Sequence, residues 1–330
     1  MGIFHCTYYM KYINLSNNQC SKIGIELENT IPDYPFLDYA LGKGINLFST
    51  AAKNTEIIDL LGKWIRTKEK SETIIILLHI KINPENIDAF LPYILDLKNK
   101  LNTNNIIIHI ADIQEITETV NSNLAELRTL VLNKGLLGLG IRTHKLGIAQ
   151  ELILKNITTL EIPINAVEHG LYLSVKNLIL ETGVIPIAIK PFGDGDLFID
   201  SYPPSLLFNS VYSLIWDTGM VVFPLSCKEE IDEIVYYESH YMEGIHPIIE
   251  DFCNKCQLCE KTCMNGYPIA RYIKYCKDID SFNKDVSDWA KTKLINEAVT
   301  FDCIGCSQCE AVCPLHVPIR KFVKEHLPLS

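Results

Sequence analysis

The sequence has no surplus of basic residues. Its 30 lysine and arginine residues are outnumbered by 40 aspartate and glutamate residues, and the formal net charge is −10. A chain this acidic is repelled by the phosphates of nucleic acid and by an anionic membrane surface. We therefore expect neither nucleic acid nor a membrane among its partners.

Targeting and membrane-spanning segments are also missing. Residues 1–10 lack the basic start and the apolar stretch of a signal peptide. The apolar run at residues 74–78 is interrupted by His79 and Lys81 and is far too short to cross a bilayer. These absences predict a cytoplasmic protein without membrane insertion.

Between residues 21 and 240, eight short apolar runs alternate with segments of helical periodicity. Eight strands, each followed by a helix, predict an α/β chain folded as a (β/α)8 TIM barrel. The expected strands are residues 22–27, 46–50, 73–80, 105–111, 136–143, 159–166, 184–191 and 221–226. The expected helices are residues 33–41, 55–66, 84–98, 124–134, 147–154, 172–181, 205–216 and 228–237.

A doubly wound Rossmann sheet is the alternative fold. It would require G-x-G-x-x-G directly after the first strand, and the sequence has no such motif there. The strands are continuous apolar runs, as expected for parallel strands that are buried on both faces. The barrel is therefore favoured.

Eight of the twelve cysteines gather in two runs near the C-terminus. Both runs have the spacing C-x2-C-x2-C-x3-C, and in a cytoplasmic protein such crowding indicates metal binding rather than disulfides. The first run is followed by Met264 and the second by Pro314. The cysteines are Cys253, Cys256, Cys259 and Cys263, then Cys303, Cys306, Cys309 and Cys313.

This spacing is typical of 4Fe-4S ligation, in which each iron takes one thiolate. Zinc, the other metal bound by C-x2-C, uses two pairs of ligands and not two runs of four. In two-cluster domains the fourth cysteine of each run reaches the other cluster. We therefore predict two 4Fe-4S clusters, with Cys313 joining the first three cysteines of the first run and Cys263 joining the first three of the second.

The cysteine runs belong to a second unit that begins near His246. Residues 269–299, between the runs, are expected to be mostly helical. This arrangement resembles the α-helical ferredoxin domain of respiratory iron–sulfur subunits. The predicted domains are a barrel at residues 1–240 and an α-helical ferredoxin-like domain at residues 241–330.

Several segments of the barrel resemble motifs of the aldo/keto reductase family. Residues 44–51, GINLFSTA, are similar to the family's G-[IV]-N-x-F-D-T-A motif. The segments NIIIHIAD, GLGIRTH and KPFGDG resemble further family motifs in the same order. The resemblance spans about residues 10–237, and one branch of the family carries a two-cluster tail of this kind.

The resemblance implies an altered catalytic centre. In active members an Asp, a Tyr, a Lys and a His act together, and the Tyr donates a proton to the substrate carbonyl. By the resemblance Lys81 and His109 correspond to the Lys and the His. Ser49 stands at the Asp position and Asn54 at the Tyr position, and an Asn is not a comparable acid.

The cofactor positions implied by the resemblance are altered as well. Arg142 stands where the family has the Ser that holds the nicotinamide amide, and Glu161 replaces the Gln that shares this task. The segment FPLSCKEEI lacks the family's glycine near the adenosine phosphate, although Lys228 opens a helix there. The implied cofactor-binding positions are Arg142, Glu161, Asn165, Lys190, Ser226 and Lys228.

Three functions remain open at the level of sequence. The first is an iron–sulfur oxidoreductase or electron-transfer protein that serves a redox partner protein or a small-molecule substrate. The second is an NADP(H)-linked reductase with a replaced acid, and the third is a non-catalytic adaptor whose clusters are structural or act as a relay. For Lys81 and His109 two roles remain open: a functional role at the C-terminal mouth of the barrel, or a structural role as interior groups that satisfy each other or Glu161.

Overall fold

The computed structural model describes the chain in two compact units. The first comprises Met1–Asn165, His169–Pro191 and Phe208–His246, and the second comprises Ala166–Glu168, Phe192–Leu207 and Pro247–Ser330. The structure describes residues 10–15, 18–27, 31–69, 71–81, 90–110, 113, 117–155, 157–195, 197, 203–241, 253, 257–279, 284–297, 303–313 and 317–326.

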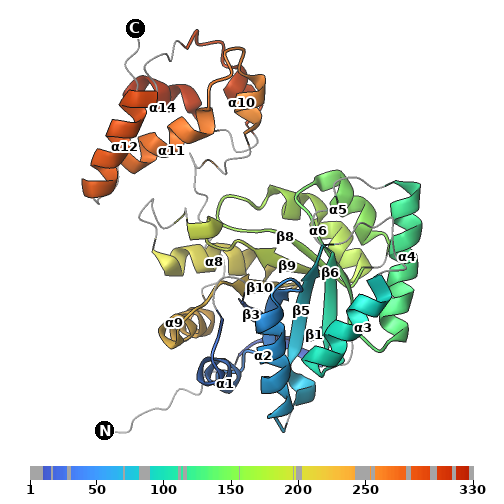
Figure 1. Ribbon diagram of the computed structural model, residues 1–330. Helices are drawn as coiled ribbons and strands as arrows, with labels where there is room; N and C mark the ends of the chain where they lie inside the picture. The colour runs from blue at the N-terminus through green and yellow to red at the C-terminus, as the bar shows by residue number, and fades with distance from the viewer. Residues whose placement is uncertain are drawn as a thin grey trace, which may run out of the picture. The chain divides into compact units, whose positions relative to one another are not determined.

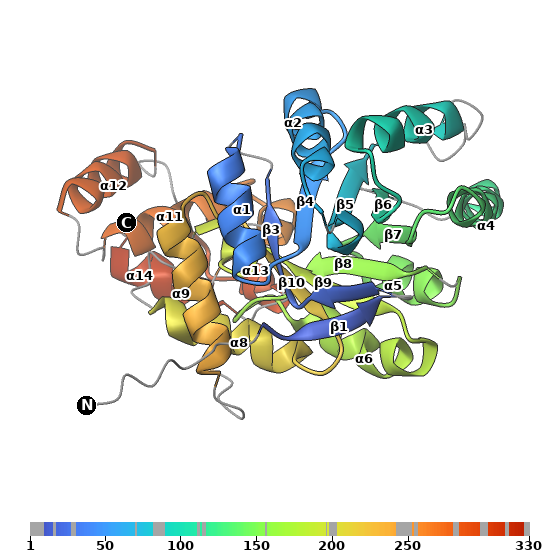
Figure 2. The same ribbon diagram turned by 90° about the horizontal axis from the view of Figure 1, so that it is seen from below.

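The first unit is a closed barrel of eight parallel strands in the order β10-β3-β4-β5-β6-β7-β8-β9. Helices surround the strands (Figures 1 and 2). All eight predicted strands are confirmed, and most are shorter than expected. They are β3 (Ile23–Glu26), β4 (Leu47–Ala51), β5 (Ile75–Ile80), β6 (Ile106–Ile110), β7 (Gly138–Arg142), β8 (Thr159–Pro163), β9 (Ile185–Ile189) and β10 (Met220–Phe223).

The helices of the barrel begin and end at residues that satisfy their terminal backbone groups. Asp33 accepts a hydrogen bond from the backbone N–H of Phe36 at the start of α1, and Gly183 ends α6 in the left-handed conformation. The helices are α1 (Tyr34–Gly42), α2 (Thr55–Arg66), α3 (Phe90–Leu101), α4 (Glu118–Asn133), α5 (Leu146–Ile153), α6 (Gly170–Thr182), α8 (Pro204–Ile215) and α9 (Lys228–Ser239).

Most predicted helix starts agree with the structure to within two residues, and the start of α4 does not. Helix α4 begins at Glu118, six residues before the predicted start, because Thr117 caps it by accepting from the backbone N–H of Val120. Residues 82–89, which precede α3, lie outside the described residues, so the predicted start of this helix at residue 84 stays a prediction.

A hairpin that the sequence analysis did not predict precedes the barrel. It consists of β1 (Tyr12–Leu15) and β2 (Asn18–Ser21), which pair antiparallel. Leu15 and Cys20 of the hairpin are fully buried and pack with interior residues of the barrel strands, including Leu47. The hairpin therefore covers the end of the barrel at which the strands begin.

The second unit is helical in the part that the structure describes. The predicted helical stretch between the cysteine runs is confirmed as two helices, which pack on each other. The helices are α10 (Leu258–Thr262), α11 (Ile269–Ile279), α12 (Lys284–Glu297), α13 (Gln308–Ala311) and α14 (Ile319–His326). Over the described residues of both units, no helix combines the length and apolar character that a membrane crossing needs.

The Asn46 side chain links the hairpin to the barrel, and its loss tests this link. Its Oδ1 accepts from the backbone N–H of Ser21 at 2.7 Å, and its Nδ2 donates to the carbonyls of Gln19 and Thr73 at 2.8 and 2.7 Å. We expect Asn46→Ala to lower the free energy of unfolding by about 3 kcal/mol, because one buried N–H group and two partly buried carbonyl groups of the backbone lose their partner.

Urea denaturation followed by tryptophan fluorescence measures the effect. Asn133→Ala, at an exposed position at the end of α4, is the control and should change stability little. Equal stabilities of the two variants would contradict the assigned role of Asn46.

Candidate functional site

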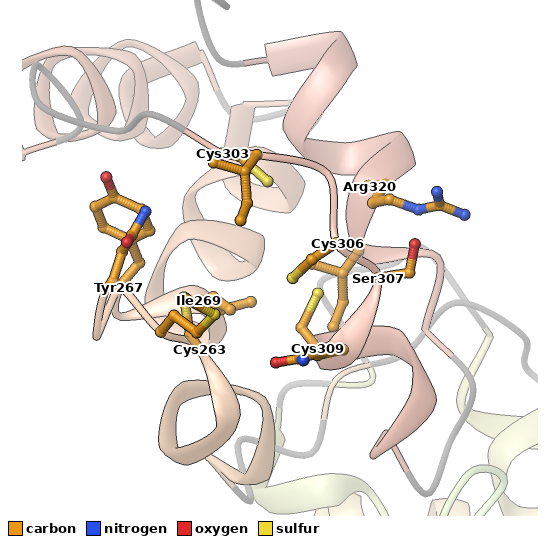
Figure 3. A pocket seen from close by; sticks show the side chains of 13 residues that line it. Cys263, Tyr267, Ile269, Cys303, Cys306, Ser307, Cys309 and Arg320 are labelled. Carbon is orange, nitrogen blue, oxygen red and sulfur yellow. The ribbon is translucent and has the colours of Figure 1, made fainter.

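A pocket in the second unit brings cysteines of both runs together. Its lining includes Cys263 from the first run and Cys303, Cys306 and Cys309 from the second (Figure 3). Tyr267, Ile269 and Ile319 supply apolar surface around them. Four soft thiolates in an apolar setting are the donor set that a 4Fe-4S cluster requires.

The remaining described cysteines of the two runs lie in or against the apolar core of the same unit. Cys259 is buried in this core, and Cys253 and Cys313 are half-buried against it. The backbone N–H of Val317 points to the sulfur of Cys313 at 3.4 Å, a contact of the kind that tunes cluster potentials. Cys256 lies outside the described residues.

The two cysteine runs have the same local backbone. Gln257 and Ser307 each directly follow the second cysteine of their run, and each has a left-handed backbone, with φ of 61° and 63°. Few residues other than glycine adopt this conformation, so its recurrence marks a required turn. Each turn leads into a short helix, α10 or α13, that carries the third cysteine.

The similarity of the two runs includes the glutamate that directly follows the third cysteine of each run. Glu260 accepts from the backbone N–H of Ala270 at 3.0 Å, at the start of α11. Glu310 accepts from the backbone N–H of Arg320 at 2.8 Å, at the start of α14. Each carboxylate therefore ties a cysteine-bearing helix to the N-terminus of the helix that follows, where negative charge is stabilising.

A second group of polar residues lies inside the barrel, on four neighbouring strands. Glu161 of β8 is fully buried, and its Oε1 lies 2.8 Å from Nε2 of His79 on β5. The Nε atom of Arg142 on β7 donates to Oε2 of Glu161 at 2.7 Å, and its Nη2 lies 3.1 Å from Nε2 of His79. A buried carboxylate is stable only when it is paired in this way.

His109 of β6 completes this group. Its Nε2 lies 2.8 Å from the hydroxyl oxygen of Thr159, and its Nδ1 lies 3.5 Å from Oε2 of Glu161. The ring fits because Gly140 of β7 faces it: a Cβ there would lie only 2.3 Å from Nε2 of His109. The rings of His79 and His109 meet edge to face, 5.6 Å apart.

The environment sets the charge of this group. Burial alone would raise the pKa of Glu161, but neighbouring groups, with His79 and Arg142 among them, hold the pKa well below its ordinary value. Burial lowers the pKa of His109 despite the neighbouring carboxylate. Glu161 is therefore ionised and His109 neutral near neutral pH.

The structure separates the two side chains that sequence analysis assigned to catalysis. His109 is fully buried in the barrel, whereas Lys81 follows the last residue of β5 and is exposed. His79, two residues earlier, is the β5 residue that meets Glu161. The sequence analysis treated His79 only as an interruption of an apolar run. Knowledge that β5 pairs with β6, which aligns His79 with His109, would have identified His79 as a site residue.

Ser49 and Asn54 lie on either side of the end of β4. Ser49 is buried, and among the described residues its hydroxyl makes no hydrogen bond. Asn54 is the residue before α2, and its side chain does not cap that helix. Neither residue offers a group that donates a proton as readily as a tyrosine.

Asn165 and Lys190 meet after β8 and β9. The Nδ2 atom of Asn165, which is fully buried, donates to the backbone carbonyl of Lys190 at 3.0 Å. Lys190 has a left-handed backbone, with φ of 55°, and its side chain is exposed. The Asn165 amide therefore holds the backbone of the next loop.

The start of α9, where the sequence suggested a phosphate, is occupied by a carboxylate of the chain itself. Glu230 accepts from the backbone N–H of Ser226 at 2.6 Å and from its hydroxyl at 3.1 Å. It also accepts from the backbone N–H of Cys227 at 3.4 Å. The Lys228 ammonium lies over the ring of Tyr39, 5.3 Å from its centre. The backbone N–H groups of Ser226 and Cys227 at this helix start are therefore already bound to a carboxylate.

Solved structures of aldo-keto reductases match the barrel. The holo form of an enzyme from Bacillus halodurans has 16% sequence identity and a TM-score of 0.57, and the match covers 70% of this chain and 91% of that one. An enzyme from Klebsiella pneumoniae, solved in complex with NADPH, has 10% identity and a TM-score of 0.59, with coverage of 72% and 92%. The barrel has the aldo-keto reductase fold.

The second unit is matched by a family model. Residues 252–318 match the family described as the 4Fe-4S dicluster domain, and this span includes both cysteine runs. No curated protein matches the chain by sequence. The chain thus joins an aldo-keto reductase-type barrel to a 4Fe-4S dicluster domain.

The space beside Gly140 tests how closely the barrel group is packed. We expect Gly140→Ala to lower the free energy of unfolding by about 1–3 kcal/mol, because the new methyl group displaces His109 and Thr159. Thermal unfolding followed by far-UV circular dichroism measures the effect.

Gly147→Ala is the matched control. A Cβ at Gly147 in α5 would meet no atom within 4 Å, and alanine is the better helix former, so this variant should be as stable as the parent or more so. If both variants had the same stability, the assigned contact between residue 140 and His109 would be incorrect.

Proposed function

We propose that this protein is an iron–sulfur oxidoreductase whose two 4Fe-4S clusters carry single electrons. The observation that supports this most directly is the pocket in which Cys263 of the first run meets Cys303, Cys306 and Cys309 of the second. The match of residues 252–318 to the 4Fe-4S dicluster domain supports it independently. An enzyme that only transfers hydride needs no iron–sulfur cluster.

In this proposal the barrel of residues 1–240 binds a small-molecule substrate or a redox partner protein at the mouth formed by the C-terminal ends of its strands. The domain of residues 241–330 holds the clusters, and the protein works in the cytoplasm. The mouth differs from a hydride-transfer site at the positions that would hold the nicotinamide amide. Arg142 and Glu161 stand there, and their side chains form an ion pair with each other. Asn54 supplies no acid in place of a tyrosine.

The second candidate is an NADP(H)-linked reductase. It is favoured by the structural match to an aldo-keto reductase solved with NADPH. The start of α9 argues against this candidate. The backbone N–H groups of Ser226 and Cys227 bind Glu230 and not a cofactor phosphate, which leaves the exposed Lys228 as the cation that this segment offers to a phosphate. We therefore rank it below the one-electron proposal.

The cluster content of anaerobically purified protein is the first test. We expect about eight iron atoms and about eight acid-labile sulfide ions per chain, and EPR signals of reduced 4Fe-4S clusters after treatment with dithionite. Zinc in place of iron, or half of this iron content, would sink the two-cluster proposal.

The exchange of fourth ligands between the runs has a sharper test. A variant with Cys253, Cys256 and Cys259 changed to Ala should keep one cluster, held by Cys263 and the first three cysteines of the second run. Adding Cys313→Ala should then change nothing. Adding Cys263→Ala should convert this cluster to a 3Fe-4S form, which is seen by EPR in the oxidised state.

The opposite pattern, in which Cys313→Ala and not Cys263→Ala damages the remaining cluster, would mean that each run binds its own cluster. The reciprocal variant, with Cys303, Cys306 and Cys309 changed to Ala, provides a second measurement if the first does not fold. In it, the remaining cluster should depend on Cys313 and be insensitive to Cys263→Ala.

Titration with NADPH and NADH separates the two candidate functions. We expect no change in cofactor fluorescence up to millimolar concentration, because Glu230 and the Arg142–Glu161 pair occupy the groups that would bind the dinucleotide. An aldo-keto reductase known to bind NADPH is the positive control. Saturable binding below this concentration would favour the reductase.

A further inference from the structure

The barrel interior holds a set of groups that is typical of a metal site and separate from the cysteines. Ligand atoms of His79, His109 and Glu161 all lie within 4.8 Å of one another, and all three residues are buried. Two imidazoles and one carboxylate form the donor set that proteins use for divalent first-row transition metals. We propose that these three residues bind one such ion, of the class of Mn²⁺, Fe²⁺ or Zn²⁺.

His109 supplies the observation that points most directly to a ligand. Its Nδ1 atom makes no hydrogen bond among the described residues, and it faces Oε2 of Glu161 at 3.5 Å. When Nε2 donates its proton to the Thr159 hydroxyl, Nδ1 presents a lone pair to this oxygen. These two electron-rich atoms repel each other, and a cation bound between them would be coordinated by both.

The contact between His109 and Thr159 is itself typical of metal sites. A ligating histidine usually donates its second ring N–H to a fixed acceptor, which sets the tautomer and the ring orientation. The fully buried Thr159 hydroxyl lies 2.8 Å from Nε2, and Gly140 leaves the space that the ring needs. The ring is therefore held with Nδ1 turned toward Glu161.

Arg142 is the group that competes with a cation. Its guanidinium donates to Oε2 of Glu161 at 2.7 Å and lies 3.1 Å from Nε2 of His79, so it occupies electron pairs that a metal would use. It also lies 4.0 Å from Oε1 of Glu26 on β3. Arg142 and Glu26 are both partly exposed, with side-chain accessibilities of 20% and 26%.

An exchange of partners resolves this competition. In the metal-free protein Arg142 neutralises Glu161. When an ion binds, repulsion between the two cations moves the guanidinium toward Glu26, which offers a second carboxylate in the more solvated part of the mouth. Binding also requires that His79 present a bare Nε2, so protons are released as the ion enters.

The experiment uses the full chain with its clusters oxidised and Mn²⁺ as the probe. Manganese prefers nitrogen and oxygen donors to thiolates, so the cysteine sites do not take it. Oxidised 4Fe-4S clusters give no EPR signal, so the loss of the free Mn²⁺ signal reports binding. We expect saturation at about one ion per chain.

Two variants test the ligand set. Glu161→Gln, which keeps the shape but removes the charge, should abolish binding. Thr159→Val should weaken it by about tenfold or more, because His109 loses the contact that orients it. His240→Ala, at an exposed position outside this group, is the control and should bind as the parent does.

The Arg142→Gln variant distinguishes a metal site from an ion-pair network that binds no metal. Without its competitor the ion should bind more tightly. The proposal is overturned if the parent binds no Mn²⁺ at millimolar concentration, even if Arg142→Gln does, because Arg142 then closes the site permanently. It is also overturned if Glu161→Gln binds like the parent. Circular dichroism and iron content confirm that each variant is folded, and neither depends on the manganese site.

Discussion

The interior of a closed eight-stranded barrel must be filled by side chains, and in this protein part of the filling is charged. Near the start of the strands the filling is apolar, and the hairpin covers it. Further along, the fully buried Glu161 needs a positive partner, and Arg142, His79 and His109 surround it. Gly140 has to be small because the His109 ring uses its space.

This constraint accounts for the polar residues that differ from the aldo/keto reductase motifs, while the barrel keeps the aldo-keto reductase fold. The positions that the resemblance assigned to cofactor binding are used by the chain for itself. Arg142 and Glu161 form an ion pair, and Glu230 caps α9 where the sequence suggested a phosphate. Each of these side chains therefore has its polar partner within the chain.

The two units use opposite kinds of donors. The dicluster domain gathers thiolates among apolar side chains and repeats one turn, at Gln257 and Ser307, to aim them. The barrel gathers imidazoles and a carboxylate, which suit harder ions and protons. The proposals for the two units therefore concern different residues, and they can be tested independently.

Much of this was predictable from the sequence because the signals are local. Apolar runs at strand length gave all eight barrel strands, and helix α2 (Thr55–Arg66) matches its prediction at both ends. The cysteine spacing indicated an iron–sulfur domain, since ligands a few residues apart on one loop need no tertiary information. The weak points were local too: α4 begins earlier than its periodicity suggested because Thr117 caps it.

The tertiary structure alone decided which polar residues meet. His79 was one polar residue in an apolar run until β5 paired with β6 and set it beside His109 and Glu161. The sequence could not reveal that Glu230 fills the start of α9, because a glutamate there is equally compatible with an open anion site. By itself the sequence determined the elements and the cysteine runs; the barrel closure, which joins strands distant along the chain, determined the site.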